Sequence, residues 1–220
     1  MKVSLVAVTS PLITGPAGER LTPDEFIVYC ARVSNPSNQL NTETAPKLIR
    51  YCIQHGHWSI FEQASMTLEI TTSRAVSAQI IRHKSFSFQE FSQRYSPVVD
   101  VEVPMMRMKA AGGNRQGSGD ELTANHPLMG VALKSIEHSL CAYEVLLNNE
   151  VAPECARMVL PMCASTTLYM TGSARSWIHY LKARLDSHTQ KEHRLVAQEA
   201  EKHFKSVFPV VWEAAFGEKQ

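Results

Sequence analysis

Four helical segments follow one another in the second half of the chain, and no other feature constrains the fold as strongly. Their apolar residues recur at helical spacing, over roughly residues 127–149, 153–161, 173–186 and 190–208. Prolines bound the second segment, and we expect the fourth to end before Pro209. The second half of the chain therefore predicts a fold with many helices and few strands.

Before residue 73, the chain predicts two helices and two strands. A hydroxyl N-cap, a proline and two acids in the first turn indicate a helix start at Thr22. A second helix is expected over about residues 45–55, with Gly56 as its left-handed cap. Strands are predicted by the apolar run 3–9 and by the alternation of Met66, Leu68 and Ile70 with polar residues.

A chain of 220 residues fits one domain of ordinary size. The predicted elements give an α+β fold, a single domain over residues 1–220 with a small mixed or antiparallel sheet and many helices. Residues 109–120 are rich in glycine and lack apolar anchors, so we expect a flexible surface loop there. We expect no internal repeat.

The charge and cysteine pattern argues against several classes of protein. The 22 Lys and Arg residues balance 21 Asp and Glu residues, so no net field attracts DNA, RNA or a membrane. The five cysteines show no CxxC spacing, which suits a reducing compartment. No apolar run approaches the ~20 residues of a membrane span, and the first residues lack a signal-peptide pattern. We therefore expect a cytoplasmic protein.

The stretch RHKSFSFQEFSQRYS, residues 82–96, combines basic, aromatic and hydroxyl side chains. A helix expected from Ser73 to about His83 would place Gln79 and Arg82 one turn apart, where they could hold one ligand. Hydroxyls, amides and arginines suit phosphate and ribose groups. The three phenylalanines either stack on a base or anchor the loop, and we favour anchoring. A single-stranded nucleic-acid surface, a nucleotide pocket and a plain buried turn all remain open.

A helix over residues 173–188 places two polar side chains on its apolar stripe. Arg184 and His188 fall on the same side as Trp177 and Leu181. A guanidinium in that position is costly unless an anion or a set of acceptors meets it. Arg184 therefore indicates a ligand site, although it could also reach solvent at the helix end or pair with Asp186.

Other catalytic patterns are absent from the sequence. The histidines at 55 and 57 and at 188 and 193 do not have metal-ligand spacing, so we expect no metal site. The chain lacks the GxSxG elbow, the phosphate-binding loop with Lys-Ser or Lys-Thr, and the GxGxxG fingerprint.

Four blocks of the sequence carry a family resemblance. RHKSFSFQEFS (82–92) is similar to the signature RHRxxxxxxxS, with Lys84 in place of the second arginine. HGHWSIFEQ (55–63), CARMVLPMC (155–163) and SARSWIHYLKARLDSHTQ (173–190) match further blocks in order and at similar spacing. Over most of its length the chain resembles the flavin-dependent thymidylate synthases.

The resemblance implies the fold of this family and a reductive methylation of dUMP to dTMP. Methylenetetrahydrofolate would supply the carbon, and FAD reduced by NADPH would supply the hydride. Family members are homotetramers with active sites shared between subunits. The implied partners are thus dUMP, folate and NADPH, with no nucleic acid and no membrane.

The resemblance also implies roles for individual residues. Those implied to hold dUMP are Gln79, Arg82, Glu90, Ser92, Gln93, Arg94, Arg157 and Arg184, with the phosphate at the Ser92–Arg94 turn. Those implied to contact FAD are Ser59, Arg82, His83, Lys84, Glu90, Ser173, Arg175 and His179, with His57 beside the flavin.

Arg184 is the implied catalytic residue, because it meets the uracil and favours ionisation at N3. Ser92 lacks a base at triad spacing, so no protein nucleophile is expected. Lys84 keeps the charge of the family's arginine but loses the planar fork, and Ser173 is shorter than the asparagine common there. Both differences concern FAD affinity.

Two alternatives belong to other classes. A single-stranded nucleic-acid module would use Arg82, Lys84 and Arg94 among the phenylalanines, but such surfaces make a domain basic. A fold relative without activity would bind nucleotide and not turn it over.

Overall fold

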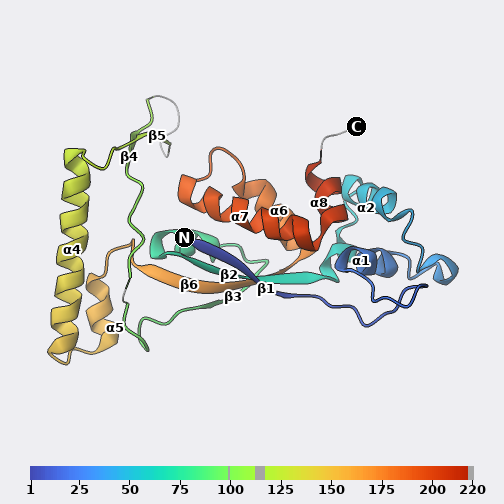
Figure 1. The fold of residues 1–220 in the computed structure, drawn as a ribbon, viewed down its shortest axis with the longest axis horizontal. Helices are drawn as coiled ribbons and strands as arrows, with labels where there is room; N and C mark the ends of the chain where they lie inside the picture. Colours follow the sequence, from blue (N-terminus) through green and yellow to red (C-terminus); the bar gives the residue numbers. More distant parts are fainter. Residues whose placement is uncertain (99, 112–116, 218–220) are drawn as a thin grey trace. The chain divides into compact units, whose positions relative to one another are not determined.

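The computed structural model describes residues 1–98, 100–111 and 117–217. Its elements, in chain order (Figure 1), are β1 (Lys2–Val8), α1 (Pro23–Ala31), η1 (Pro36–Asn38), α2 (Ala45–Gln54), η2 (Trp58–Glu62), β2 (Ser65–Ser73), α3 (Arg74–Ile80), β3 (Ser87–Glu90), β4 (Arg107–Lys109), β5 (Ser118–Glu121), α4 (Pro127–Asn148), α5 (Pro153–Ala156), η3 (Arg157–Val159), β6 (Ser165–Ser173), α6 (Ala174–Arg184), α7 (Lys191–Val207) and α8 (Pro209–Phe216). The predicted α+β class is confirmed. Among the described residues, no helix is both long and apolar enough to cross a bilayer.

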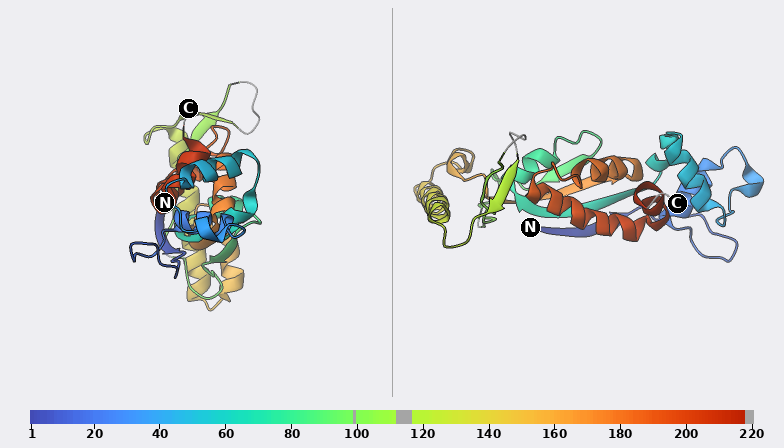
Figure 2. Two further views of the ribbon diagram at one scale, coloured as in Figure 1. Left: turned by 90° about the vertical axis from the view of Figure 1, so that its right-hand side faces the viewer. Right: turned by 90° about the horizontal axis from the view of Figure 1, so that it is seen from above.

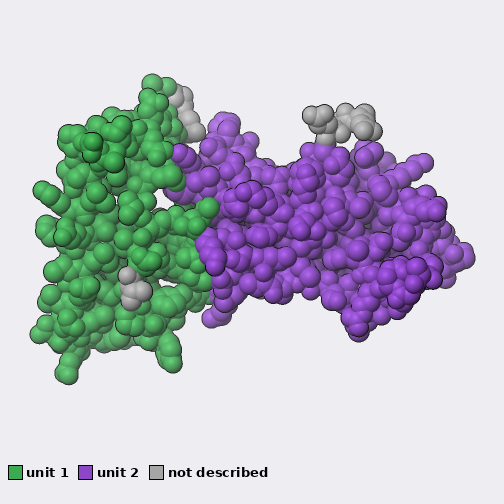
Figure 3. All heavy atoms as spheres, in the orientation of Figure 1, with its two compact units in different colours: residues 1, 71–80, 90–168 green, residues 2–70, 81–89, 169–220 purple. Residues whose placement is uncertain are grey.

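The chain divides into two compact units, each built from separate segments (Figure 3). Unit 1 contains Met1, Thr71–Ile80 and Glu90–Leu168, and unit 2 contains Lys2–Ile70, Ile81–Gln89 and Tyr169–Gln220. The division falls within β2, β3 and β6. That the chain forms one domain stays a prediction.

A four-stranded sheet has the order β1-β2-β6-β3, and β4 pairs with β5 in an antiparallel ribbon. Strands β2 and β6 run antiparallel. In unit 2 the hydroxyls of Thr67 and Thr171 lie 2.9 Å apart, and in unit 1 those of Thr71 and Thr167 lie 3.0 Å apart. The small antiparallel sheet is therefore as predicted.

The core of unit 2 lies between strand side chains and the C-terminal helices. Met66, Leu68 and Ile70 of β2 are buried, as their alternation predicts. Helices α6, α7 and α8 pack in sequence, and α6 and α7 lie side by side (Figure 2). Trp177 of α6 is fully buried, and its Nε1 donates to the carbonyl of Met66 at 3.2 Å.

Residues close in sequence define the start of α1 and the end of α2. Thr22 and Glu25 form a reciprocal capping box at the start of α1, as the sequence predicts. Helix α2 ends before Gly56, which has the positive φ of 72° that favours glycine.

Unit 1 is built around α4 and the shorter helices α5 and η3, which pack on it. Its small core contains Val98, Tyr143, Ala156 and Ala164. The hydroxyl of Tyr143 accepts from the backbone N–H of Val98 at 3.3 Å. Only Met129 and Tyr143 of α4 are buried, so most of this 22-residue helix is exposed in the described chain.

Two predicted helix ends are wrong. Helix α3 ends at Ile80, so Arg82 lies in the following turn rather than one helical turn beyond Gln79. The chain turns after Ile80 instead: the N–H of Phe86 donates to the carbonyl of His83 at 3.2 Å, and Phe86 is buried against Trp177 of α6. Helix α6 ends at Arg184, so His188 is not on its apolar stripe and is 80% exposed.

The sequence did not predict two elements, β6 and α8. Helix α8 follows α7 at once, whereas the helical part of the chain was expected to end before Pro209.

The expected absence of a repeat was also wrong. ASMTLEITTS (64–73) and ASTTLYMTGS (164–173) form β2 and β6, and each leads directly into a helix. In unit 1 the N–H of Arg74 donates to the carbonyl of Ala164 at 2.9 Å, and in unit 2 that of Ala174 donates to Ala64 at 2.8 Å.

The predicted loop 109–120 includes strand residues at both of its ends. Lys109 ends β4, and Ser118–Glu121 forms β5. Residues 112–116 lie outside the described residues, so the flexibility of this segment stays a prediction.

Candidate active site

Arg184 is the last residue of α6 and is half-buried, on the side of the helix that carries Trp177 and Leu181. Its Nε donates to Nε2 of His83 at 2.8 Å. Asp186 does not pair with it: this carboxylate accepts from the N–H of His188 at 2.8 Å and contacts its ring nitrogen at 2.7 Å. Arg184 thus lies on the apolar side of the helix, as its spacing from Trp177 and Leu181 predicts, and its hydrogen-bond partner is a histidine.

Neutral aromatic side chains surround this arginine. The rings of His83 and Tyr180 meet edge to face at 4.9 Å, and Nε2 of the buried His193 lies 3.2 Å from the Tyr180 hydroxyl. Burial, followed by the charge of Arg184, lowers the pKa of His83 to about 4. Burial also lowers the pKa of His193 to about 3 and raises that of Tyr180. At neutral pH none of the three carries charge.

The predicted flavin residues of unit 2 include two exposed cations, Arg82 and Lys84, in the turn after α3. Neither forms a hydrogen bond or ion pair with another described residue. Phosphate groups need such donors. The residues present therefore fit a dinucleotide, with His57 and Ser59 exposed at the start of η2.

Glu62 holds two more of the predicted flavin residues. Ser173 donates to its Oε2 at 2.5 Å, and Arg175 contacts its Oε1 at 3.0 Å. Ser173 also caps α6 by accepting from the N–H of Ser176. The ring of Trp58 lies 4.7 Å from that of His179, whose pKa is lowered by burial first. The sequence argument missed Trp58 and Glu62, although both lie in the HGHWSIFEQ block.

Phe86 anchors the turn that carries His83. It is 8% exposed, and its ring meets that of Trp177 at 4.8 Å. The Ser176 hydroxyl donates to the carbonyl of Ser85 at 2.9 Å and ties the same turn to α6. The anchoring interpretation is confirmed for Phe86, while Phe91, in unit 1, is 37% exposed.

In unit 1, Glu90 collects three contacts at the end of β3. Its Oε1 lies 2.6 Å from Nη1 of Arg74 and accepts from Ser77 at 2.6 Å and Thr166 at 3.1 Å. None of these three partners was predicted as a site residue. Arg74 is the one with a sequence signal, since it is a cation at the start of a helix whose later residues are mostly apolar.

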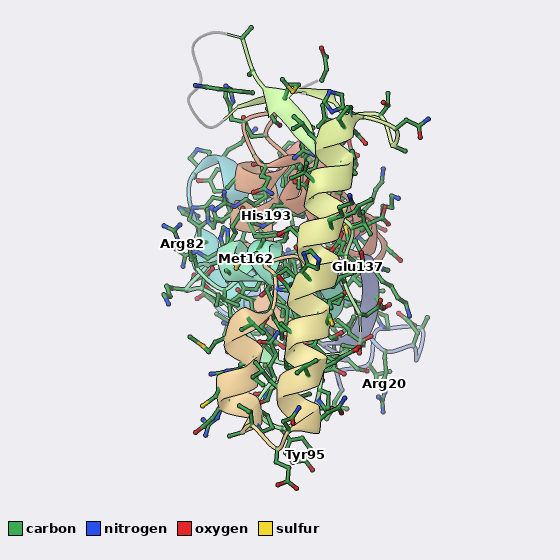
Figure 4. The ribbon with its side chains drawn as sticks, turned by 90° about the vertical axis from the view of Figure 1, so that its left-hand side faces the viewer. Arg20, Arg82, Tyr95, Glu137, Met162 and His193 are labelled. Carbon is green, nitrogen blue, oxygen red and sulfur yellow. The ribbon has the colours of Figure 1, made fainter. Side chains whose placement is uncertain are left out.

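The other predicted dUMP residues of unit 1 lie on three elements. Ser92 begins a turn in which its carbonyl accepts from the N–H groups of Tyr95 and Ser96 at 3.1 Å. Gln93 is buried, and Arg94 contacts Glu154 at 3.2 Å, with both side chains exposed. Tyr95, 93% exposed, points away from the protein (Figure 4). Gln79 on α3 and Arg157 at the start of η3 are half-buried.

The structure thus divides the predicted site residues. Unit 2 holds Arg82, Arg184 and the flavin candidates other than Glu90, while unit 1 holds Glu90, Gln79, Arg157 and the Ser92–Arg94 turn. In the described part of the chain, no three His, Cys, Asp or Glu side chains cluster to hold a metal ion.

Known sequences match nearly all of this chain. The profile of the family described as "Thymidylate synthase complementing protein" matches residues 19–210. The chain belongs to the flavin-dependent thymidylate synthase family. It is 48% identical over 217 residues to the "Flavin-dependent thymidylate synthase" of Synechocystis sp., covering 96% of this chain and 97% of the relative. It is 43% identical over 216 residues to the "Probable flavin-dependent thymidylate synthase" of Paramecium bursaria Chlorella virus 1, covering 97% and 98%.

A solved structure gives the same family fold. The UMP/dUMP methylase PolB from Streptomyces cacaoi, bound with 5-Br dUMP, superposes with a TM-score of 0.81 at 30% identity. The match covers 98% of this chain and 95% of PolB. The resemblance seen in the four sequence blocks is therefore confirmed at the level of the family.

Proposed function

We propose that the protein is a flavin-dependent thymidylate synthase that methylates dUMP reductively to dTMP. Methylenetetrahydrofolate donates the carbon, and NADPH reduces the FAD. Membership of the family and the likeness to a dUMP methylase support this function. The observation that carries it is Arg184, a half-buried guanidinium without a carboxylate partner among the described residues.

Arg184 acts on the pyrimidine by charge. A cation beside the ring stabilises the electron-rich uracil that attacks the carbon donor. Its site is only partly open to water, so the charge is screened less than in bulk solvent. Ser92 positions substrate and does not attack it, because no base in the described chain hydrogen-bonds to its hydroxyl.

The remaining residues bind ligands. The turn at Ser92–Arg94 and the half-buried Arg157 supply donors for the dUMP phosphate, while Arg74, Ser77 and Thr166 fix the Glu90 carboxylate. Arg82 and Lys84 supply cations for the FAD phosphates, with Ser173, Arg175 and His179 along α6. When bound, FAD supplies the redox step that completes the methyl group.

The test is turnover of purified, FAD-loaded protein with dUMP, methylenetetrahydrofolate and NADPH. We expect flavin absorbance and formation of dTMP. Arg184→Ala should abolish dTMP formation without loss of fold, and Arg20→Ala, which removes an exposed arginine outside the site, should not. Protein that stays colourless with FAD and forms no dTMP would rule out this function.

We also propose that the enzyme works as a homotetramer with shared active sites, in the cytoplasm. The support for this assembly lies in unit 1, where helix α4 faces the viewer in Figure 4. On α4 and after it, the exposed large apolar side chains are Leu128, Val131, Leu133, Val145, Met158 and Met162. Monomers expose such patches rarely. Light scattering after gel filtration measures the assembly, and a 24.6 kDa species at working concentration would contradict it.

A further inference from the structure

Arg184 is fixed at one of its three nitrogens. Its Nε donates to His83 at 2.8 Å, and neither terminal amino group bonds to another described residue. A guanidinium is a rigid planar fork with five N–H donors. A single bond at Nε therefore restricts the plane of the group and leaves the four terminal donors for a ligand.

The direction of this bond defines the state of His83. Arginine stays protonated, so its Nε–H donates and His83 accepts with the lone pair of Nε2. The imidazole must then be neutral, with its proton on Nδ1. The partly buried position and the nearby positive charge of Arg184 favour this neutral form, in agreement with a pKa of about 4.

His83 is itself held by packing. Tyr180 lies one turn before Arg184 on α6, and its ring meets His83 nearly at a right angle, 79°. The Tyr180 hydroxyl lies 3.2 Å from Nε2 of His193, which is fully buried on α7. The turn after α3, α6 and α7 thus meet at this cluster, and the buried Tyr180 ring restricts the orientations open to the half-buried imidazole.

We propose that His83 is a positioning residue for Arg184, with Tyr180 and His193 as its support. His83 orients the guanidinium so that both terminal amino groups meet two neighbouring acceptors on one edge of the pyrimidine ring. This inference rests on the proposed function. It gives His83 a role other than the FAD contact that the family resemblance implies.

The expected benefit is pre-organisation. A free arginine side chain samples many rotamers, whereas one held at Nε loses little freedom when the substrate binds. Misplacement of a catalytic group by about 1 Å can cost on the order of a hundredfold in rate. Loss of the His83 acceptor should therefore lower kcat more than it changes the KM for dUMP.

Two substitutions of His83 test this role. His83→Ala removes the acceptor, and we expect kcat to fall roughly tenfold to a hundredfold. His83→Gln places an amide oxygen near the position of Nε2, and we expect it to recover most of the rate. The rates are measured at saturating FAD, and FAD bound per protomer is checked by absorbance in both variants, so that weaker flavin binding is separated from a lower kcat. Thermal melting checks that each variant is folded.

A double-mutant cycle separates positioning from a general structural role. Arg184→Lys keeps a cation but has no Nε–H to donate, so His83→Ala on that background should change the residual rate less than twofold. An equal loss in both backgrounds would overturn the proposal. So would a loss of activity that saturating FAD restores, since His83 would then be a flavin ligand.

A measurement without cofactor or substrate tests the geometry directly. Nitrogen-15 NMR of the imidazoles in the flavin-free protein at pH 7.5 should show His83 neutral, protonated at Nδ1 and unprotonated at Nε2. A proton on Nε2 would refute the hydrogen bond. If instead the wild-type enzyme makes no dTMP, the proposed function fails, and the role of His83 in catalysis fails with it. That result is distinct from a proton found on Nε2 of His83, which would refute only the hydrogen bond to Arg184.

Discussion

Gly172→Ala should destabilise the protein by forcing Phe86 out of its site. A Cβ at Gly172 would lie 2.5 Å from Cδ1 and from Cε1 of the Phe86 ring. Ordinary carbon contacts are about 3.5–4.0 Å, so the ring has to move by about 1 Å. It cannot retreat towards Trp177, because that ring is fully buried and its Nε1 is bonded to the Met66 carbonyl at 3.2 Å.

The expected cost is that of an overpacked core, about 1–3 kcal/mol. At about 2–4 °C per kcal/mol for a chain of this size, Tm should fall by about 2–12 °C. Because Phe86 anchors the turn of Arg82, His83 and Lys84, FAD affinity should also fall. Circular dichroism melting and fluorescence titration with FAD measure the two effects.

Two controls sharpen this experiment. Gly130→Ala lies in α4 with nothing within 4 Å of its Cβ, so it should stabilise slightly, by up to about 1 kcal/mol. Phe86→Leu combined with Gly172→Ala should destabilise less than the sum of the two single changes, because leucine lacks Cε1 and its Cδ atoms can rotate away from the new methyl group. A Gly172→Ala protein that melts with or above the wild type would refute the packing argument.

Two further predictions concern pH. Burial raises the pKa of Asp24 to about 6, although its carboxylate accepts from the N–H groups of Val210 and Val211 at 2.8 and 3.3 Å. The native state then binds the proton more tightly than the unfolded state, so this group makes the protein less stable as pH rises from about 4 to 6, by up to about 3 kcal/mol. Asp24→Asn should remove that slope in denaturant titrations, and an unchanged slope would contradict it. His193 acts in the opposite direction: its native pKa of about 3 lies below the unfolded value, so stability should fall as pH drops below about 6.5. His193→Gln should flatten that acid limb of the curve, and an equally steep limb would show that another group causes it.

The parts of the fold that the sequence predicted are those set by neighbouring residues. The capping box of α1, the glycine after α2 and the alternation of β2 all act within a few residues. Helix α8 was missed because Pro209 was interpreted as a stop, although a proline at the first helical position also starts a helix. The carboxylate that accepts from the first N–H groups of α8 is Asp24, 186 residues away from Val210, which no local pattern reveals.

The same limit, that sequence patterns report only on neighbouring residues, applies to the candidate site. The helical pattern alone placed Arg184 facing inward, because an arginine among Trp177 and Leu181 breaks the apolar stripe. It could not name the partner, since His83 lies 101 residues away in the chain. The end of α3 was misplaced for a related reason: the burial of Phe86 against α6, a tertiary contact, competes with the helix.

Three arginines, Arg74 in unit 1 and Arg175 and Arg184 in unit 2, differ in what neutralises them. Arg175 pairs with Glu62 at 3.0 Å, and Arg74 pairs with Glu90 at 2.6 Å, so much of their charge is already balanced. Arg184 meets a neutral imidazole instead, which fixes its direction and leaves its positive charge intact. A partly buried cation without a counter-ion costs stability. In the proposed reaction, negative charge that develops on the pyrimidine would offset this cost, and a neutral His83 leaves the charge of Arg184 available for it.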